Sequence, residues 1–146
     1  MGTTNFDAVA AATAFLGNVT GNVTGNLTGQ VTAFPVTART ATAAPGGTTG
    51  VIADAGALQV IAVTCDDANK VITLPTPTPG VVVVLINGAT GYELRSSAPA
   101  TVAINGGSGA NAESAVAAST VVVAICTSAT TWLAFAVALS TAEAAA

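Results

Sequence analysis

The sequence contains no histidine and few charged side chains. Only 3 of its 146 residues are Lys or Arg and 7 are Asp or Glu, so charged residues make up 7% of the chain, against about 25% in an average globular protein. Without histidine, the chain lacks the commonest general base and the commonest non-thiolate zinc ligand. This excludes histidine-based catalytic triads, zinc fingers and haem ligation by histidine. We therefore expect no enzyme activity, no metal site and no cofactor.

The scarcity of cations also limits the partners. Three basic residues are too few to form a patch that binds the phosphates of a nucleic-acid backbone. The net charge of −4 would also repel those phosphates. Residues 114–142 carry no charge, but their β-branched residues and Ser/Thr breaks favour two strands and a turn over a membrane-spanning helix. We therefore expect neither a nucleic acid nor a membrane as partner.

Cysteine is nearly absent as well. Cys65 and Cys126 are the only thiols of the chain. One disulfide between them is compatible with the sequence, but two small buried thiols on strands are the favoured interpretation. The start of the chain, MGTTNF, has no basic region before an apolar run, so no secretory leader is expected.

Residues 5–16 are predicted to form a short helix within an N-terminal segment, residues 1–16. Asn5 suits an N-cap, Asp7 suits the positive end of the helix dipole, and Gly17 suits the stop. The residues that share one face are Phe6, Val9, Thr13 and Leu16. So short a helix is marginal alone, and its apolar stripe needs a surface to cover.

Residues 17–32 read GNVT, GNVT, GNLT, GQVT, a four-residue repeat in four copies. In an extended chain, an even period keeps Gly and aliphatic residues on one side and Asn, Gln and Thr on the other. One such ribbon cannot bury its apolar edge, whereas three ribbons wound together can. The segment therefore predicts the shaft of a parallel homotrimer. Its expected interface residues are Val19, Gly21, Val23, Gly25, Leu27 and Val31.

Two other interpretations of the repeat remain. A flexible polar linker has this composition, although it needs neither the register nor the regular aliphatic residues. The second interpretation is N-glycosylation, because Asn18, Asn22 and Asn26 each begin an N-x-T sequon. These sequons follow from the repeat itself, and no secretory leader is expected to accompany them.

The rest of the chain is predicted to be all-β. Residues 33–50 read as an extended connector, residues 51–140 as a small β-sandwich or jelly-roll-like knob, and residues 141–146 as a tail. The run Val81–Ile86 has no polar alternation, so both of its faces should be covered, and another subunit is a candidate for one of the covers. The expected strands are Leu58–Thr64, Lys70–Leu74, Val81–Ile86, Tyr92–Ser96, Thr101–Ile104, Thr120–Cys126 and Trp132–Val137.

Candidate site residues are few. The pattern Gly107-x-Gly109-x-x-Ala112 matches a relaxed dinucleotide fingerprint, but the acidic residue and the βαβ context are missing, so a surface loop is favoured. Asp66 and Asp67 favour a solvated turn over a catalytic pair. Tyr92 and Trp132 are the large amphipathic aromatics; core packing is their default interpretation and sugar stacking the alternative.

Two features together resemble a known class. The GNVT-type repeat resembles the intertwined shafts of bacteriophage fibre proteins. The following segments resemble the small β knobs of phage head fibres, capsid decoration proteins and some tail fibres. They are Thr73-Leu74-Pro75, Asn87-Gly88, Ile104–Gly107 and Thr131-Trp132. The resemblance covers about residues 17–138 and contains no catalytic motif.

This resemblance implies a trimeric virion protein that is made in the host cytoplasm and decorates the outer capsid surface. Its partners would be two further copies and the major capsid protein or other virion proteins. The capsid anchor would be residues 1–16, through Phe6, Val9, Phe15 and Leu16. The alternative is a tail-tip adhesin that recognises a host-surface glycan through its knob. Its expected ligand-facing residues are Tyr92, Trp132 and Asn111.

Overall fold

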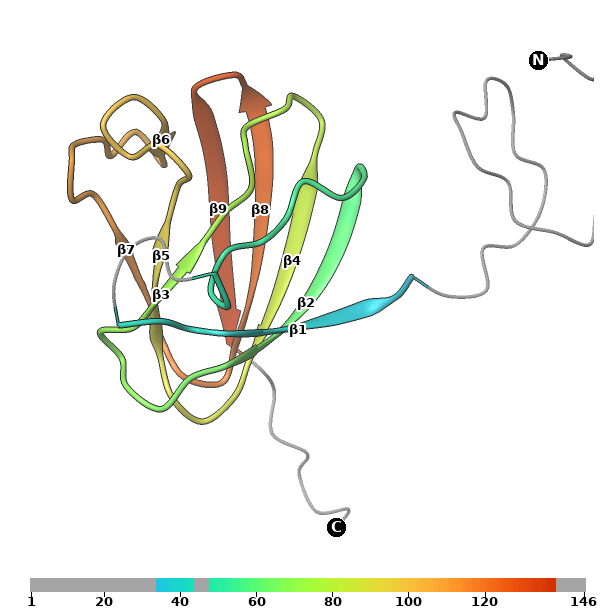
Figure 1. Cartoon of the computed structure of the whole chain (residues 1–146), viewed down its shortest axis with the longest axis vertical. Helices are drawn as coiled ribbons and strands as arrows, with labels where there is room; N and C mark the ends of the chain where they lie inside the picture. Colours follow the sequence, from blue (N-terminus) through green and yellow to red (C-terminus); the bar gives the residue numbers. More distant parts are fainter. Residues whose placement is uncertain (1–33, 44–47, 139–146) are drawn as a thin grey trace, which may run out of the picture. The chain divides into compact units, whose positions relative to one another are not determined.

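A computed structural model describes residues 34–43 and 48–138, which we call the β domain. These residues form strands and turns, and none of them lies in a helix. The predicted all-β class is confirmed for this part of the chain. The strands are β1 (Val36–Thr40), β2 (Leu58–Thr64), β3 (Val71–Thr73), β4 (Val82–Asn87), β5 (Tyr92–Arg95), β6 (Ala103–Ile104), β7 (Ser114–Val116), β8 (Thr120–Ser128) and β9 (Thr131–Ala138) (Figure 1).

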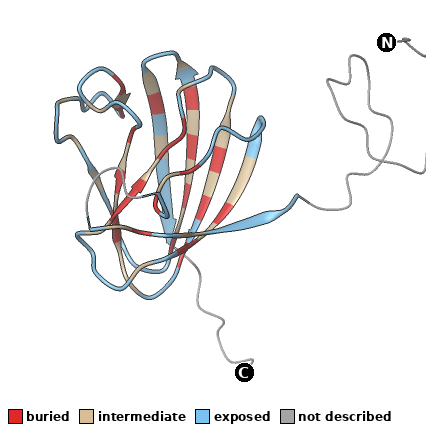
Figure 2. Cartoon of the chain, viewed as in Figure 1, coloured by how far each residue is buried: buried red, intermediate tan, exposed pale blue. Residues whose placement is uncertain are grey.

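The strands form two sheets around one core. The larger sheet has the order β1-β2-β4-β8-β9-β6 and the smaller sheet the order β3-β5-β7. Ile61, Leu85 and Val122 of the larger sheet belong to the same buried cluster as Ile72 and Leu94 of the smaller one. Buried residues alternate with less buried ones along the strands of the larger sheet (Figure 2). The alternation follows from the two-residue period of a strand.

The first half of the β domain winds like a solenoid. The chain passes from β2 to β3 in the smaller sheet and returns to the larger sheet as β4, parallel to β2. Val36 lies opposite Val60, and Val60 opposite Val84, so each coil advances the register by 24 residues. In the smaller sheet Val51 bridges to Thr73, an advance of 22 residues. Parallel strands require a crossover, and here a segment in the opposite sheet supplies it.

The second half of the β domain is largely antiparallel. β8 pairs antiparallel with both β4 and β9, and β7 pairs antiparallel with β5. Asn105 extends the short pairing of β6 with β9, because its side-chain amide accepts a hydrogen bond from Ala134 N and donates one to Ala134 O, both 2.9 Å long. Asn105 and Gly106 have φ values of 51° and 84°, a left-handed conformation that Asn and Gly tolerate.

The structure differs from the prediction in three respects. A jelly roll is built from antiparallel strands, whereas β1, β2 and β4 are parallel, so the jelly-roll-like part of the prediction is wrong. The segment 33–50, interpreted as a connector, contributes β1 to the larger sheet. The short strand β7 was not predicted either. The helix expected over 5–16, the repeat at 17–32 and the tail at 141–146 lie outside the described residues.

Candidate functional surface

The side of the larger sheet that faces away from the core is largely apolar on β1, β2, β4, β8 and β9, with Thr40 and Thr64 at the end of β1 and β2. The register aligns Val36, Val60, Val84, Val123 and Phe135 in one rung across all five strands. The neighbouring rungs are equally apolar, since residues two apart on a strand share a face. We call this surface the outer face. Its residues are Val36, Ala38, Leu58, Val60, Ala62, Val82, Val84, Ile86, Val121, Val123, Ile125, Leu133, Phe135 and Val137.

None of the side chains on the outer face is buried. Those along its middle are half-buried by their neighbours, and those at its margins are 38–62% exposed, Phe135 at 54% and Val137 at 62% among them. The opposite side of the same strands carries Ile61, Leu85 and Val122, which are 2% exposed or less. The larger sheet is thus hydrophobic on both sides, a pattern found in sheets that are covered on both sides.

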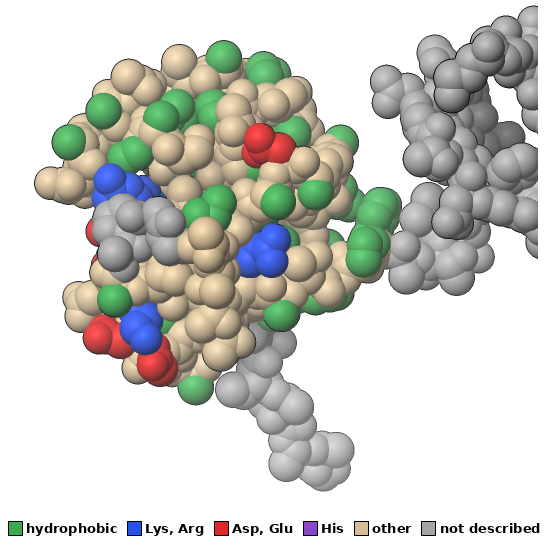
Figure 3. Space-filling view, in the orientation of Figure 1, with side chains coloured by type: hydrophobic (Ala, Val, Ile, Leu, Met, Phe, Trp, Pro, Cys, Tyr) green, Lys and Arg blue, Asp and Glu red, His purple; other side chains and the backbone are tan. Residues whose placement is uncertain are grey.

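The charged side chains of the β domain lie off the outer face. Arg39 projects from β1 in register with the buried Val63, and so to the opposite side. The other described charges belong to turns or to the smaller sheet: Asp54, Asp66, Asp67, Lys70, Glu93, Arg95 and Glu113. In the view of Figure 3 charged groups are few, and hydrophobic side chains gather where β1 begins. The outer face therefore offers contact without charge.

The charged groups of one turn stabilise that turn. Lys70 Nζ lies 2.6 Å from Asp66 Oδ1, and this hydrogen bond lowers the pKa of Asp66. Asp67 Oδ1 accepts hydrogen bonds from the backbone N and from Nδ2 of Asn69, both 2.9 Å long, which lower the pKa of Asp67. All three ionised groups face water. Asp66 and Asp67 thus serve an exposed turn, and neither is held as a general acid or base.

A second charged group fastens a loop to the smaller sheet. Arg95 binds Glu113 through Nη1 at 2.8 Å and donates from Nη2 to Ala110 O at 2.7 Å. Burial, and to a lesser degree Glu113, raises the pKa of the neighbouring Glu93. Within residues 34–43 and 48–138, no group of three or more His, Cys, Asp or Glu side chains is placed to hold a metal ion.

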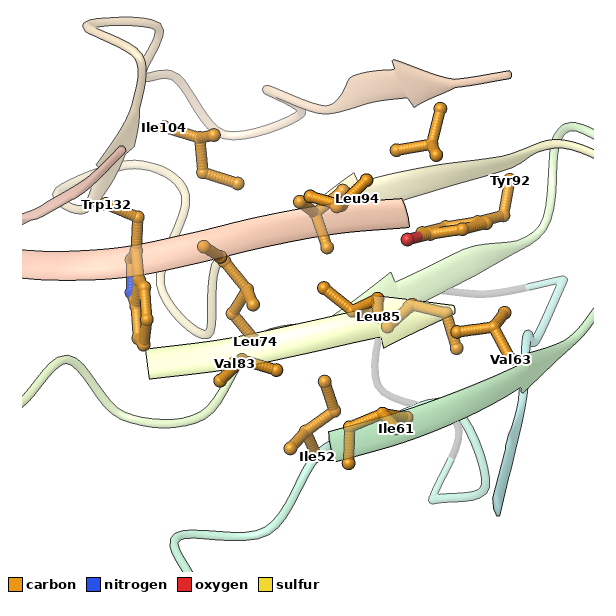
Figure 4. Packing of buried hydrophobic residues seen from close by; sticks show 14 of the residues in the cluster. Ile52, Ile61, Val63, Leu74, Val83, Leu85, Tyr92, Leu94, Ile104 and Trp132 are labelled. Carbon is orange, nitrogen blue, oxygen red and sulfur yellow. The ribbon is translucent and has the colours of Figure 1, made fainter. Parts of the chain in front are cut away.

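The residues expected to face a ligand do not form a site. Trp132 is 0% and Tyr92 1% exposed, and they point into the core near its opposite ends (Figure 4). Burial raises the pKa of the Tyr92 hydroxyl. Asn111 is exposed on the loop before β7. Neither aromatic ring is available at the surface, because both rings pack within the hydrophobic core.

Both cysteines of the chain are free thiols. Cys126 is buried on β8 and its Sγ donates to Ser128 O at 3.1 Å. Burial raises its pKa, which makes the reactive thiolate scarcer. Cys65 is half-buried directly after β2, where its Sγ donates to Asp67 O at 3.0 Å.

One open cleft lies where β2 and β4 begin, a feature that the sequence did not predict. Its volume is about 500 Å³, and it is lined by residues 54–57, 75–76 and 78–81 together with Gln59. Asp54 Oδ1 accepts a hydrogen bond from Thr76 N at 2.8 Å across it. The proline-rich turn TPTPG supplies much of the wall. No nucleophile in the lining is paired with a base.

The predicted trimer and anchor residues, from Phe6 to Val31, lie outside the described part of the chain. The described residues contain no helix that could cross a membrane. Comparisons of the chain with protein-family models, with curated proteins and with solved structures find no match. What the chain does must therefore be argued from its own residues.

Proposed function

We propose that this chain is a homotrimeric structural protein of a virus particle, a capsid decoration or head-fibre protein. It binds the outer capsid and stabilises it. The observation that carries the proposal is the outer face, a continuous apolar surface that crosses five strands and bears no charge. Contiguous exposed apolar surface of this kind marks sites of protein–protein contact.

The sequence before the β domain supports the same conclusion. The repeat at residues 17–32 has the period of an extended ribbon with one apolar edge, which copies of the chain can bury against each other. The β domain adds no group arranged for acid–base or metal chemistry. A protein with surfaces for assembly suits a structural role.

The location in the particle follows from the resemblance to phage fibres. The shaft would hold three β domains outside the capsid, and residues 1–16 would bind where capsid subunits meet. Phe6, Val9, Phe15 and Leu16 supply the apolar contacts of this anchor.

The alternative is a tail-associated adhesin that binds a host glycan. The cleft at the start of β2 and β4 is the feature that favours it, since Asp54, Gln59 and Thr76 offer polar groups beside apolar walls. Sugar sites commonly stack a ring on an aromatic side chain, and both candidates for that role, Tyr92 and Trp132, are buried. We therefore place the adhesin second.

Electron microscopy of gold-labelled particles tests the proposal. Antibodies against the purified chain would be applied to particles of the virus that encodes it. Many gold particles spread over the head are expected for a decoration protein. Label confined to the tail tip would establish the adhesin instead, and particles without label would overturn both.

A further inference from the structure

We infer that the outer face packs against the outer faces of two further copies of this chain, around a common three-fold axis. This inference rests on the proposed trimer and adds the surface by which the β domains associate. The β domain already has one core between its two sheets. The outer face would form the wall of a second core, shared by three chains.

Only a short stretch of sequence separates the repeat from β1. The repeat ends at residue 32 and β1 begins at Val36. The four residue steps from 32 to 36 span at most about 14 Å, since an extended chain covers about 3.3–3.6 Å per residue. In the proposed trimer, the β1 strands of the three copies would therefore begin within this distance of the end of one shaft. β1 is an edge of the larger sheet, and Val36 and Ala38 belong to the outer face.

A tethered partner needs less contact area than a free one. The outline of the outer face is about 400 Å², from five strands about 4.8 Å apart and rungs that extend over about five residues. The large side chains at its margins are 38–62% exposed. A shaft that holds three copies together raises their effective concentration to about the millimolar range, so a smaller contact suffices.

The charge of the chain agrees with this partner. Each copy has a net charge of −4, so copies repel each other wherever their charges approach closely. The outer face holds none of the described charges, and the acidic turn with Asp66 and Asp67 lies beyond it. An uncharged face is therefore the surface on which like-charged copies can meet at least cost.

The unplaced segments of the same chain are the other occupants to consider. Residues 139–146, LSTAEAAA, hold one leucine and otherwise small or charged residues, too little apolar area for the whole face. The apolar residues of 1–16 are separated from the β domain by the whole repeat in the sequence and are assigned to the proposed anchor. In the proposed trimer, the copies joined by the shaft would be the occupants of the outer face.

Photo-cross-linking of the full-length chain tests this surface. Phe135, 54% exposed on the outer face, would be replaced by p-benzoylphenylalanine, which keeps an aromatic ring at that position. The matched control carries the same residue at Ala115, which is exposed on β7 of the other sheet. Native mass measurement of each sample before illumination reports whether the chain is a trimer.

Illumination of the Phe135 variant is expected to give covalent dimers and trimers on a denaturing gel, with cross-linked peptides from β2, β4, β8 or β9 of another copy. The Ala115 control should remain monomeric on the gel. A trimer by mass that forms no such cross-link, or one that cross-links within its own chain to residues 1–33 or 139–146, overturns the inference and leaves the trimer intact. A monomer by mass overturns the proposed trimer as well.

Discussion

At the scale of single residues, the burial of Trp132 shows that it has a packing role and not a surface role. Trp132 is completely buried, and within the described chain its Nε1–H has no hydrogen-bond partner. A buried donor without an acceptor costs free energy, so the apolar area of the ring must more than compensate for it. Trp132 therefore acts as a core residue in spite of its polar atom.

Replacing Trp132 with alanine should lower the free energy of unfolding by about 3–5 kcal/mol, the usual cost of deleting a large buried ring. Trp132→Phe should cost clearly less, because it keeps most of the apolar contact and removes the unpaired N–H. Urea denaturation of the full-length chain measures both. Equal stability of Trp132→Ala and the unchanged protein would show that the ring is not part of the core.

Two glycines of the segment between β4 and β5 should respond differently to the same substitution. A Cβ atom at Gly91 would lie 2.6 Å from the backbone oxygen of Val116, whereas one at Gly88 would meet nothing within 4 Å. Gly91→Ala should therefore destabilise the domain by about 1–3 kcal/mol, and Gly88→Ala should leave it nearly unchanged. Thermal unfolding of the pair checks this difference, and equal melting temperatures would contradict the packing of β7 against Gly91.

At the scale of elements, Arg95 holds the loop 105–113 to β5 by its contacts with Glu113 and Ala110. Glutamine at position 95 cannot make both contacts. Arg95→Gln should therefore speed hydrogen exchange in residues 105–113 by about tenfold or more, while exchange in β4 and β8 stays slow. Unchanged exchange in the loop would show that the ion pair does not hold it.

The pH dependence of stability should contain a contribution from Glu93 on the same strand. Burial raises its pKa above the ordinary value of 4.5, so the folded chain binds this proton more tightly than the unfolded chain. Stability from this group falls as pH rises from about 4.5 through the raised pKa. The melting temperature of Glu93→Gln minus that of the unchanged protein should therefore increase as the pH rises from 4 to 7. A constant difference would contradict the raised pKa.

The sequence predicted the elements better than their arrangement. β2 matches its predicted range, and β4, β5, β8 and β9 differ from theirs only at the ends, because apolar runs between turn residues locate strands. The direction of pairing is not encoded locally, so the parallel coils were missed. Few residues recur at the 24-residue spacing, Val36, Val60 and Val84 being one such set. β1 was missed because its small and polar residues become a strand only through pairing with β2.

The candidate surface was predictable only in part. The unalternating run Val81–Ile86 indicated that both faces of that strand should be covered, and the structure covers the inner one by the smaller sheet. That an apolar outer face extends over five strands depends on register, which a single strand does not reveal. The burial of Tyr92 and Trp132 also depends on packing, so their proposed contact with a ligand could not be decided beforehand.

At the scale of the whole molecule, the proposed trimer explains why the chain can carry so few charged residues. A monomer with 7% charged residues and an uncovered apolar sheet would be prone to aggregate. In the proposed trimer, the shaft and the outer faces are buried together, and the solubility of each chain depends on the assembly.

A double substitution in the predicted shaft should dissociate the trimer into monomers. Val23 and Leu27 lie on the predicted apolar edge of the repeat, and Val23→Asp with Leu27→Asp would place charges at the three-fold axis, where they cannot be solvated. Sedimentation should show monomers, or aggregates that associate through the outer face. Aspartates at Asn22 and Asn26, on the polar edge, form the control and should leave the trimer intact. Equal behaviour of the two pairs would favour a flexible linker.

The native mass of the purified full-length chain at micromolar concentration is the most direct measurement. A homotrimer predicts a single species at three times the 13.9 kDa of one chain, unchanged on dilution because shaft and outer face act together. A stable species at 13.9 kDa would contradict the trimer, and with it both the shaft and the shared core around the outer face.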